Sequence, residues 1–173
     1  MVTSLATLAN GVNGTGEDKG GAIYWIGANG VVINSGFRNN NASIGGGIYF
    51  NSSASNCKVS SCYFVGNNAT YNGGAIDWNA TNGNLTNTLF VENNADYGAA
   101  LCRESGSTRG HGQNNTFLYN HAGISGAALA WLGVDGININ NYTFINNTAF
   151  KSGGAIYVSP TSHNCSIIDS YFE

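Results

Sequence analysis

The chain repeats one short pattern, Phe-x-x-Asn-x-Ala, at a nearly constant interval. The pattern occurs five times, and its copies begin at Phe37, Phe64, Phe90, Phe117 and Phe144. A sixth phenylalanine, Phe172, follows on the same interval, so that successive phenylalanines are 27, 26, 27, 27 and 28 positions apart. A period in this range indicates a fold in which one small unit stacks on its neighbours, because each unit needs a neighbour to bury its apolar face.

A second motif, Gly-Gly-Ala-Ile and its variants, keeps the same interval. Its six copies end on Ile23, Ile48, Ile76, Leu101, Leu129 and Ile156. The spacing from each phenylalanine to the next Ile or Leu is 11 or 12 residues, whereas the spacing from Ile or Leu to phenylalanine varies from 14 to 16. We therefore expect one side of the repeating unit to be fixed and the other to carry the variation in length.

The repeating unit reads as short strands joined by tight corners. Helical periodicity is missing, and glycine and asparagine are too frequent for long helices. Runs such as Val31–Asn34 and Lys58–Ser61 precede the phenylalanines and read as strands, and a third strand must lie around each Ile of the second motif. Such units favour a parallel β-helix over a hairpin meander, and strand crossovers of this kind are almost always right-handed.

We therefore predict an all-β fold, a right-handed parallel β-helix (solenoid) of about six coils with roughly 27 residues per coil. The coils occupy residues 20–173, and residues 1–19 form an irregular lead-in or a first partial coil. Six in-phase copies that stop inside a coil suggest a piece of a longer array.

Stacking turns each repeat position into a column of equivalent residues. We expect the Phe and Ile/Leu columns to point inward, with the Gly or Ala two residues before each Ile leaving room for the rings. Each motif asparagine suits a left-handed corner and can hydrogen-bond along the axis. A further column, two residues after the Ile, should also lie in the core. Its aromatic members are Trp25, Phe50, Trp78 and Trp131.

Composition excludes several classes of function. Charged residues make up only 9% of the chain, and the net charge is −3 with six basic residues in no cluster, which argues against nucleic acid as a partner. No stretch approaches 18 apolar residues, so we expect no membrane-spanning segment. Ten Asn-x-Ser/Thr sequons occur, but in a chain this rich in Asn, Ser and Thr many arise by chance. The low charge and the abundant amide and hydroxyl side chains favour an extracellular or cell-surface location. The four cysteines have neither metal-ligand nor convincing disulfide spacing, and we expect mostly free thiols.

The paired motifs resemble the repeats of chlamydial polymorphic outer-membrane proteins and those of adhesin-like surface proteins of methanogenic archaea. The run Gly-Gly-Ala-Ile-Tyr-Trp at residues 20–25 and the frequent Asn-Asn-x-Ala are especially similar to the archaeal set. The resemblance covers residues 20–173 and implies a β-helix displayed at the cell surface, with adhesion as the usual assignment. It implies no catalytic residues.

Two candidate ligand-binding surfaces follow from the repeat. The column just after the Ile should point outward and offer a flat platform for a sugar or a protein, with Tyr24, Tyr49 and Asp77 as its main members. The alternative is that these tyrosines only shield the sheet. The second surface is the variable segment 103–112, whose Arg103, Arg109 and His111 could bind a ligand. The alternative there is a plain solvated loop.

The favoured function is a non-enzymatic, adhesin-like surface protein or stalk that binds a glycan or a cell-surface protein, with neither metal nor cofactor. The nine carboxylates are scattered, and none shares a column with another on a neighbouring coil, which disfavours a polysaccharide-degrading enzyme. That enzyme stays an alternative. A third possibility is a filament or spike formed by end-to-end association, because both ends of such a rod expose strand edges.

Overall fold

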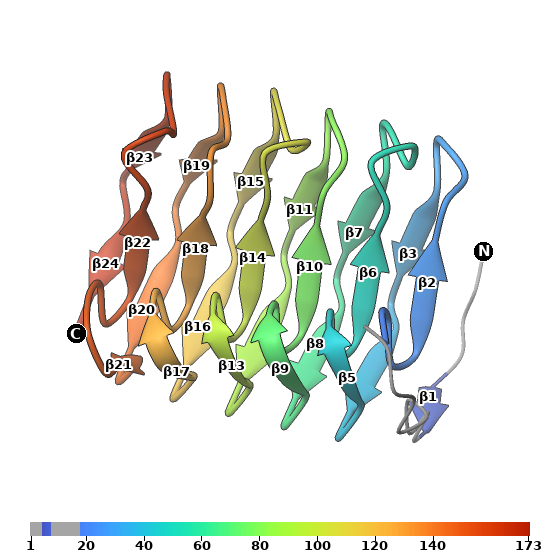
Figure 1. Cartoon of the computed structure of the whole chain (residues 1–173), viewed down its shortest axis with the longest axis horizontal. Coiled ribbons are helices and arrows are strands. Elements are labelled where there is room, and N and C mark those ends of the chain that lie inside the picture. Colours follow the sequence, from blue (N-terminus) through green and yellow to red (C-terminus); the bar gives the residue numbers. More distant parts are fainter. Residues whose placement is uncertain (1–4, 8–17) are drawn as a thin grey trace.

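Short runs of alternating inward and outward residues, separated by glycine and asparagine, fold into a stack of coils (Figure 1). The structure is a computed structural model that describes residues 5–7 and 18–173. Each coil contributes one strand to each of four parallel sheets, and equivalent residues of neighbouring coils pair directly, as Phe64 does with Phe90. Within the described residues there is no helix. The predicted parallel solenoid of about six coils, with about 27 residues per coil, is therefore confirmed.

Two of the four sheets carry the two sequence motifs. Sheet C holds the Ile of the glycine motif and is made of β2 (Ile23–Trp25), β6 (Ile48–Phe50), β10 (Ile76–Trp78), β14 (Leu101–Arg103), β18 (Leu129–Trp131) and β22 (Ile156–Val158). Sheet A holds the phenylalanines and is made of β1 (Leu5–Thr7), β4 (Gly36–Arg38), β8 (Tyr63–Val65), β12 (Leu89–Val91), β16 (Thr116–Leu118), β20 (Thr143–Ile145) and β24 (Tyr171–Phe172).

The other two sheets complete the coil. Sheet D, between C and A in chain order, is made of β3 (Val31–Ile33), β7 (Lys58–Ser60), β11 (Asn84–Thr86), β15 (His111–Gln113), β19 (Asn138–Asn140) and β23 (Ser166–Ile168). Sheet B, between A and the next C, is made of β5 (Asn41–Ile44), β9 (Asn68–Asn72), β13 (Asn94–Tyr97), β17 (His121–Ser125) and β21 (Thr148–Ala149). The sequence pattern did not predict the strands of sheet B.

Part of the predicted lead-in over residues 1–19 lies outside the described residues. Within that lead-in, β1 pairs in parallel with β4, and an isolated bridge joins Lys19 to Ile44. The boundary predicted at residue 20 stays a prediction.

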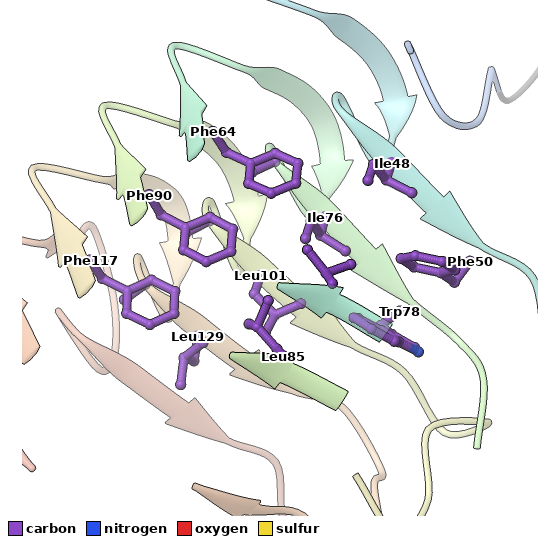
Figure 2. Packing of buried hydrophobic residues seen from close by; sticks show 14 of the residues in the cluster. Ile48, Phe50, Phe64, Ile76, Trp78, Leu85, Phe90, Leu101, Phe117 and Leu129 are labelled. Carbon is purple, nitrogen blue, oxygen red and sulfur yellow. The ribbon is translucent and has the colours of Figure 1, made fainter. Parts of the chain in front are cut away.

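The core is a spine of stacked rings beside a column of aliphatic side chains (Figure 2). The five phenylalanines from Phe37 to Phe144 are almost completely buried, and neighbouring rings stack with centroids 4.5–5.2 Å apart. Phe172 stacks on Phe144 at 4.7 Å but stays half exposed on the last coil. Ile48, Ile76 and their equivalents Leu101 and Leu129 are buried beside the rings. Both predicted inward columns are confirmed.

The glycine motif has a different role from the predicted one. Its first glycine has a left-handed backbone in every copy, and at Gly73 a Cβ would lie 2.3 Å from the Ile76 carbonyl oxygen. Its second position does not face the phenylalanines, because a Cβ at Gly74 would meet the Asn94 carbonyl oxygen of sheet B at 2.3 Å. The third position faces the rings, since a Cβ at Gly47 would lie 3.2 Å from Phe64. The prediction for the second position was therefore wrong.

The motif asparagines form a buried ladder along the axis, as predicted. Asn93 accepts hydrogen bonds from the Asn67 Nδ2 and backbone nitrogen, both at 3.0 Å. It donates from Nδ2 to the Asn120 Oδ1 at 2.9 Å and to the Phe64 carbonyl oxygen at 3.1 Å. The left-handed residue is the one before each asparagine, such as Glu92, so the corner prediction was wrong by one position.

Variation in coil length falls in the loops between sheets C and D. They range from residues 26–30 to residues 104–110 and project from one side of the rod (Figure 1). The other three corners hardly change, because the ladder and the motif glycine fix them. This agrees with the spacing of the two motifs.

Exposed apolar side chains gather on the last coil. Phe150, Ile167, Ile168 and Phe172 are all at least 40% exposed there. End-to-end association of rods through such a face stays a prediction.

The ring spine makes a sharp prediction about stability. Replacing Phe90 with alanine should lower the free energy of unfolding by about 3–5 kcal/mol, because it removes a buried ring and leaves a cavity between Phe64 and Phe117. The matched control is Leu89→Ala on the same strand, where the side chain is 37% exposed and the loss should stay below about 1 kcal/mol. Urea unfolding measures both, and equal losses would refute the inward stacking of the rings.

Candidate functional site

The outer strip of sheet C, the first predicted binding platform, is mostly covered. This strip is the column after the Ile, and its members are Tyr24, Tyr49, Asp77, Cys102, Ala130 and Tyr157. Tyr24 is 46% exposed and stacks on Tyr49, with ring centroids 5.3 Å apart. Tyr49, Asp77 and the next two members are buried, so the prediction of an exposed platform was wrong for all but its ends.

In three coils, the side chain of the residue before the motif glycine lies over this strip or at its border. The Lys19 ammonium lies 5.1 Å from the centre of the Tyr49 ring. Asn72, at the end of β9, donates from Nδ2 to the Glu104 Oε1 at 2.9 Å. Tyr97, at the end of β13, contacts Tyr157 with ring centroids 6.3 Å apart. Sheet B therefore shields the outer face of sheet C, and this cover could not be predicted while sheet B itself was missed.

Asp77 is a carboxylate enclosed by this cover. It lies in register between Tyr49 and Cys102, it is completely buried, and neither carboxylate oxygen has a hydrogen-bond partner of good geometry. Burial raises the pKa of Asp77 well above its ordinary value, and the negative charge of Glu104 raises it further. The neighbouring Cys102 thiol and the Lys19 charge offset only part of this effect. Both effects favour the neutral, protonated form of Asp77.

Arg103, predicted as a ligand-binding residue of the variable loop, lies in the core. It occupies the inward column of sheet C between Trp78 and Trp131, and it is 2% exposed. Its guanidinium lies 4.8 Å from the centre of the Trp78 ring, and its Nη1 donates to the Ser107 Oγ at 3.0 Å. Burial lowers its pKa to about 10. Gly110 makes room, since a Cβ there would lie 2.6 Å from the Arg103 Nη1.

The predicted aromatic core column is otherwise confirmed. Phe50, Trp78 and Trp131 are almost completely buried, and Trp25 packs against the same core.

Unlike Arg103, both Arg109 and His111 are exposed. Arg109 lies just before β15, and His111 is its first residue. The Arg109 backbone nitrogen donates to the Asp135 carbonyl oxygen at 2.9 Å, which fixes the loop beside the next coil. His111 begins β15 and points away from the core, because the next residue, Gly112, occupies the inward column between Leu85 and Ile139.

His111 lines a hollow on the outer face of sheet D. The hollow has a volume of about 370 Å³, and it is lined by Asn84, Thr86, His111, Gly112, Gln113, Asn138 and Asn140. We call it the sheet D hollow. It spans three consecutive coils, because β11, β15 and β19 pair in register. Its side chains are amides, a hydroxyl and an imidazole, without a carboxylate, an ammonium or a guanidinium among them.

Apart from His111, the side chains of the hollow were not predicted. A signal was present, since polar residues flank a central small or apolar residue in three successive coils, at residues 84–86, 111–113 and 138–140. In a strand, the flanking residues share the outer face. This pattern is common on solvated strands, so the sequence alone did not single it out.

Neither a metal site nor a disulfide is present among the described residues. No group of three or more His, Cys, Asp or Glu side chains in residues 5–7 and 18–173 is arranged to hold a metal ion. Cys57, Cys62, Cys102 and Cys165 are all free thiols, as expected. In the same part of the chain, no helix is long and apolar enough to cross a bilayer.

The state of Asp77 predicts an unusual dependence of stability on pH. The unfolded carboxyl group ionises above about pH 4, whereas the raised pKa of the folded one means that it ionises only at a higher pH. Its contribution to stability is therefore full below that pH and is lost as the pH rises through the raised folded-state pKa. Urea midpoints should fall across this range in the parent protein, and Asp77→Asn should remove much of the fall. The exposed carboxylate control Asp169→Asn should keep it. An unchanged slope in Asp77→Asn would contradict the neutral buried acid.

Comparison with known proteins agrees with the motifs. A family model described as the Chlamydia polymorphic membrane protein repeat matches residues 61–77 and 141–159. No curated protein and no solved structure gives a significant match to the chain. Each matched segment contains one Phe-x-x-Asn pattern and the following Gly-Gly-Ala-Ile motif, so the resemblance to the chlamydial repeat is confirmed, while the archaeal resemblance stays a prediction. Segments of two coils of this parallel β-solenoid thus match the repeat of chlamydial polymorphic membrane proteins.

Proposed function

We propose that this chain is a non-enzymatic, adhesin-like rod of the cell surface, which presents loops and sheet faces to a glycan or protein ligand. The observation that carries the proposal is the match of segments of two coils to the polymorphic membrane protein repeat, within one unbroken stack of coils. That repeat family is associated with the outer membrane or the cell surface. An extracellular position and adhesion go beyond the match and form part of the proposal.

The build of the rod supports a role in presentation. Buried asparagines and stacked rings join every coil to the next, which makes the stack rigid along its axis. The loops between sheets C and D carry the differences between coils and project from one side (Figure 1). Variable loops on a rigid scaffold are common carriers of recognition.

The position of the carboxylates supports a non-enzymatic reading over a polysaccharide-degrading enzyme. Glycosidases need two carboxyl groups that flank the scissile bond. The carboxylates were expected to be scattered, but Asp77 and Glu104 are near enough for the negative charge of Glu104 to raise the pKa of Asp77. Asp77, however, is completely covered, so a polymer cannot reach it.

An adhesion assay with a parallel hydrolysis assay tests the proposal. Beads coated with the protein should adhere to some members of a panel of cells, whereas albumin-coated beads should not. The same protein should release no new sugar ends from a panel of polysaccharides. Cleavage that Asp77→Asn or Glu104→Gln abolishes would favour the enzyme. Adhesion to none of the cell types would count against the adhesin.

A further inference from the structure

The sheet D hollow differs from the other polar columns of the rod because its side chains are not paired with one another. Elsewhere, asparagines of neighbouring coils hydrogen-bond in ladders, such as Asn141 Nδ2 to Asn114 Oδ1 at 2.9 Å and Asn82 Nδ2 to Asn56 Oδ1 at 2.9 Å. These two exposed ladders lie just beyond the two ends of the sheet D strands. They border the hollow with amides whose hydrogen bonds run along the rod.

Inside the hollow, hydrogen-bonding groups are open. Among the hydrogen bonds of residues 18–173, none involves the side chain of His111, Gln113 or Asn140. The Asn84 Oδ1 is shielded from water by the surrounding atoms and also lacks a partner. That oxygen is closed to a ligand as well, so Asn84 can hydrogen-bond a ligand through its Nδ2, which has no partner in the protein and remains open to solvent.

Side-chain pairs close the hollow at both ends. The hydroxyl groups of Ser60 and Thr86 hydrogen-bond at 2.9 Å on one side, and Ser166 donates to the Asn138 Oδ1 at 2.6 Å on the other. The open side chains lie on β11, β15 and β19. Gly112 contributes its backbone to the floor, and it must be glycine because a Cβ there would point inward and collide with Tyr142 in the core.

The chemistry of the lining selects a neutral, hydroxyl-rich ligand. Amides and an imidazole offer both donors and acceptors, as sugar hydroxyls do, and no carboxylate or permanent cation lines the hollow. Neighbouring coils present equivalent groups about 4.8 Å apart, which is close to the length of one ring unit in an extended sugar chain. A volume of about 370 Å³ leaves room for a short stretch of such a chain.

We propose that the sheet D hollow binds an uncharged glycan whose chain runs along the rod axis, with Asn84, His111 and Gln113 as hydrogen-bonding residues. This inference rests on the proposed adhesin function and names its ligand class. Binding is weak for a single hollow, because no aromatic side chain lines it to stack on a sugar ring. Repeated surfaces on a cell would strengthen it through multivalency.

Saturation-transfer NMR and calorimetry test the inference with defined oligosaccharides. The probes are the neutral hexasaccharides of mannose, glucose and N-acetylglucosamine, with hexagalacturonate as the anionic comparison. The protein is produced in bacteria that do not N-glycosylate, because Asn84-Leu85-Thr86 is a sequon whose modification would fill the hollow. At least one neutral probe should bind, and hexagalacturonate should not bind more tightly.

Variants locate the binding. His111→Ala and Gln113→Ala should each lower the affinity for the neutral probe about fivefold, which is the effect of losing one neutral hydrogen bond. The double variant should lower the affinity further. The matched control is His121→Ala, an exposed histidine of sheet B whose Nδ1 lies 3.0 Å from the Thr148 Oγ1. It should leave binding unchanged. Unfolding midpoints close to those of the parent establish that each variant keeps its fold.

Two results overturn the inference and leave the adhesin intact. One is adhesion to cells that the double variant retains in full. The other is binding of hexagalacturonate alone, with a strong dependence on salt, because that result assigns the surface to an anionic ligand. If the parent protein adheres to no cells, the proposed adhesin function is overturned, and the ligand assignment is overturned with it.

Discussion

The whole structure depends on a buried asparagine ladder that joins every coil to the coils on both sides. In the middle of the ladder, the Asn93 amide accepts two hydrogen bonds from the preceding coil and donates one to the following coil. Its remaining donor goes to the Phe64 carbonyl oxygen, so the side chain is fully paired inside the protein. Because an unpaired buried amide is costly, a coil that slipped by one residue would lose all of these bonds. The ladder thereby fixes the register in which the phenylalanine rings stack.

This constraint explains where the chain can vary. The corner that contains the ladder keeps its length, and the corner that contains the motif glycine keeps its length up to β18, whereas the loops between sheets C and D, such as 51–57 and 79–83, differ. The outer face of sheet D follows the same division, since its inward residues Val59, Leu85 and Ile139 are apolar while the outward ones change. Structural and recognition roles therefore occupy different positions of one short repeat, and a ligand site can change without disturbing the stack.

Periodicity predicted everything that depends on one coil lying over the next: the parallel solenoid, the ring spine and the ladder. It could not predict the cross-section of the coil, because the angle between sheets B and C depends on contacts such as Gly74 against the Asn94 carbonyl. Asp77 was therefore expected on the surface although sheet B covers it. Arg103 was predicted on the surface because it is charged, although its position two residues after Leu101 belongs to the inward column. The unpaired groups of the sheet D hollow depend on side-chain contacts that no spacing records.

The central claim is that the buried ladder, rather than the exposed asparagines beside it, holds the coils in register. Urea unfolding of Asn93→Ala and Asn94→Ala compares the two most directly, because Asn94 is an exposed neighbour whose Nδ2 donates to the Asn68 Oδ1 at 2.8 Å. Asn93→Ala leaves two Asn67 donors without their acceptor, removes a hydrogen bond to the Phe64 carbonyl oxygen, and should cost about 3 kcal/mol or more. Asn94→Ala should cost less than about 1 kcal/mol. Equal losses in the two variants would contradict the account.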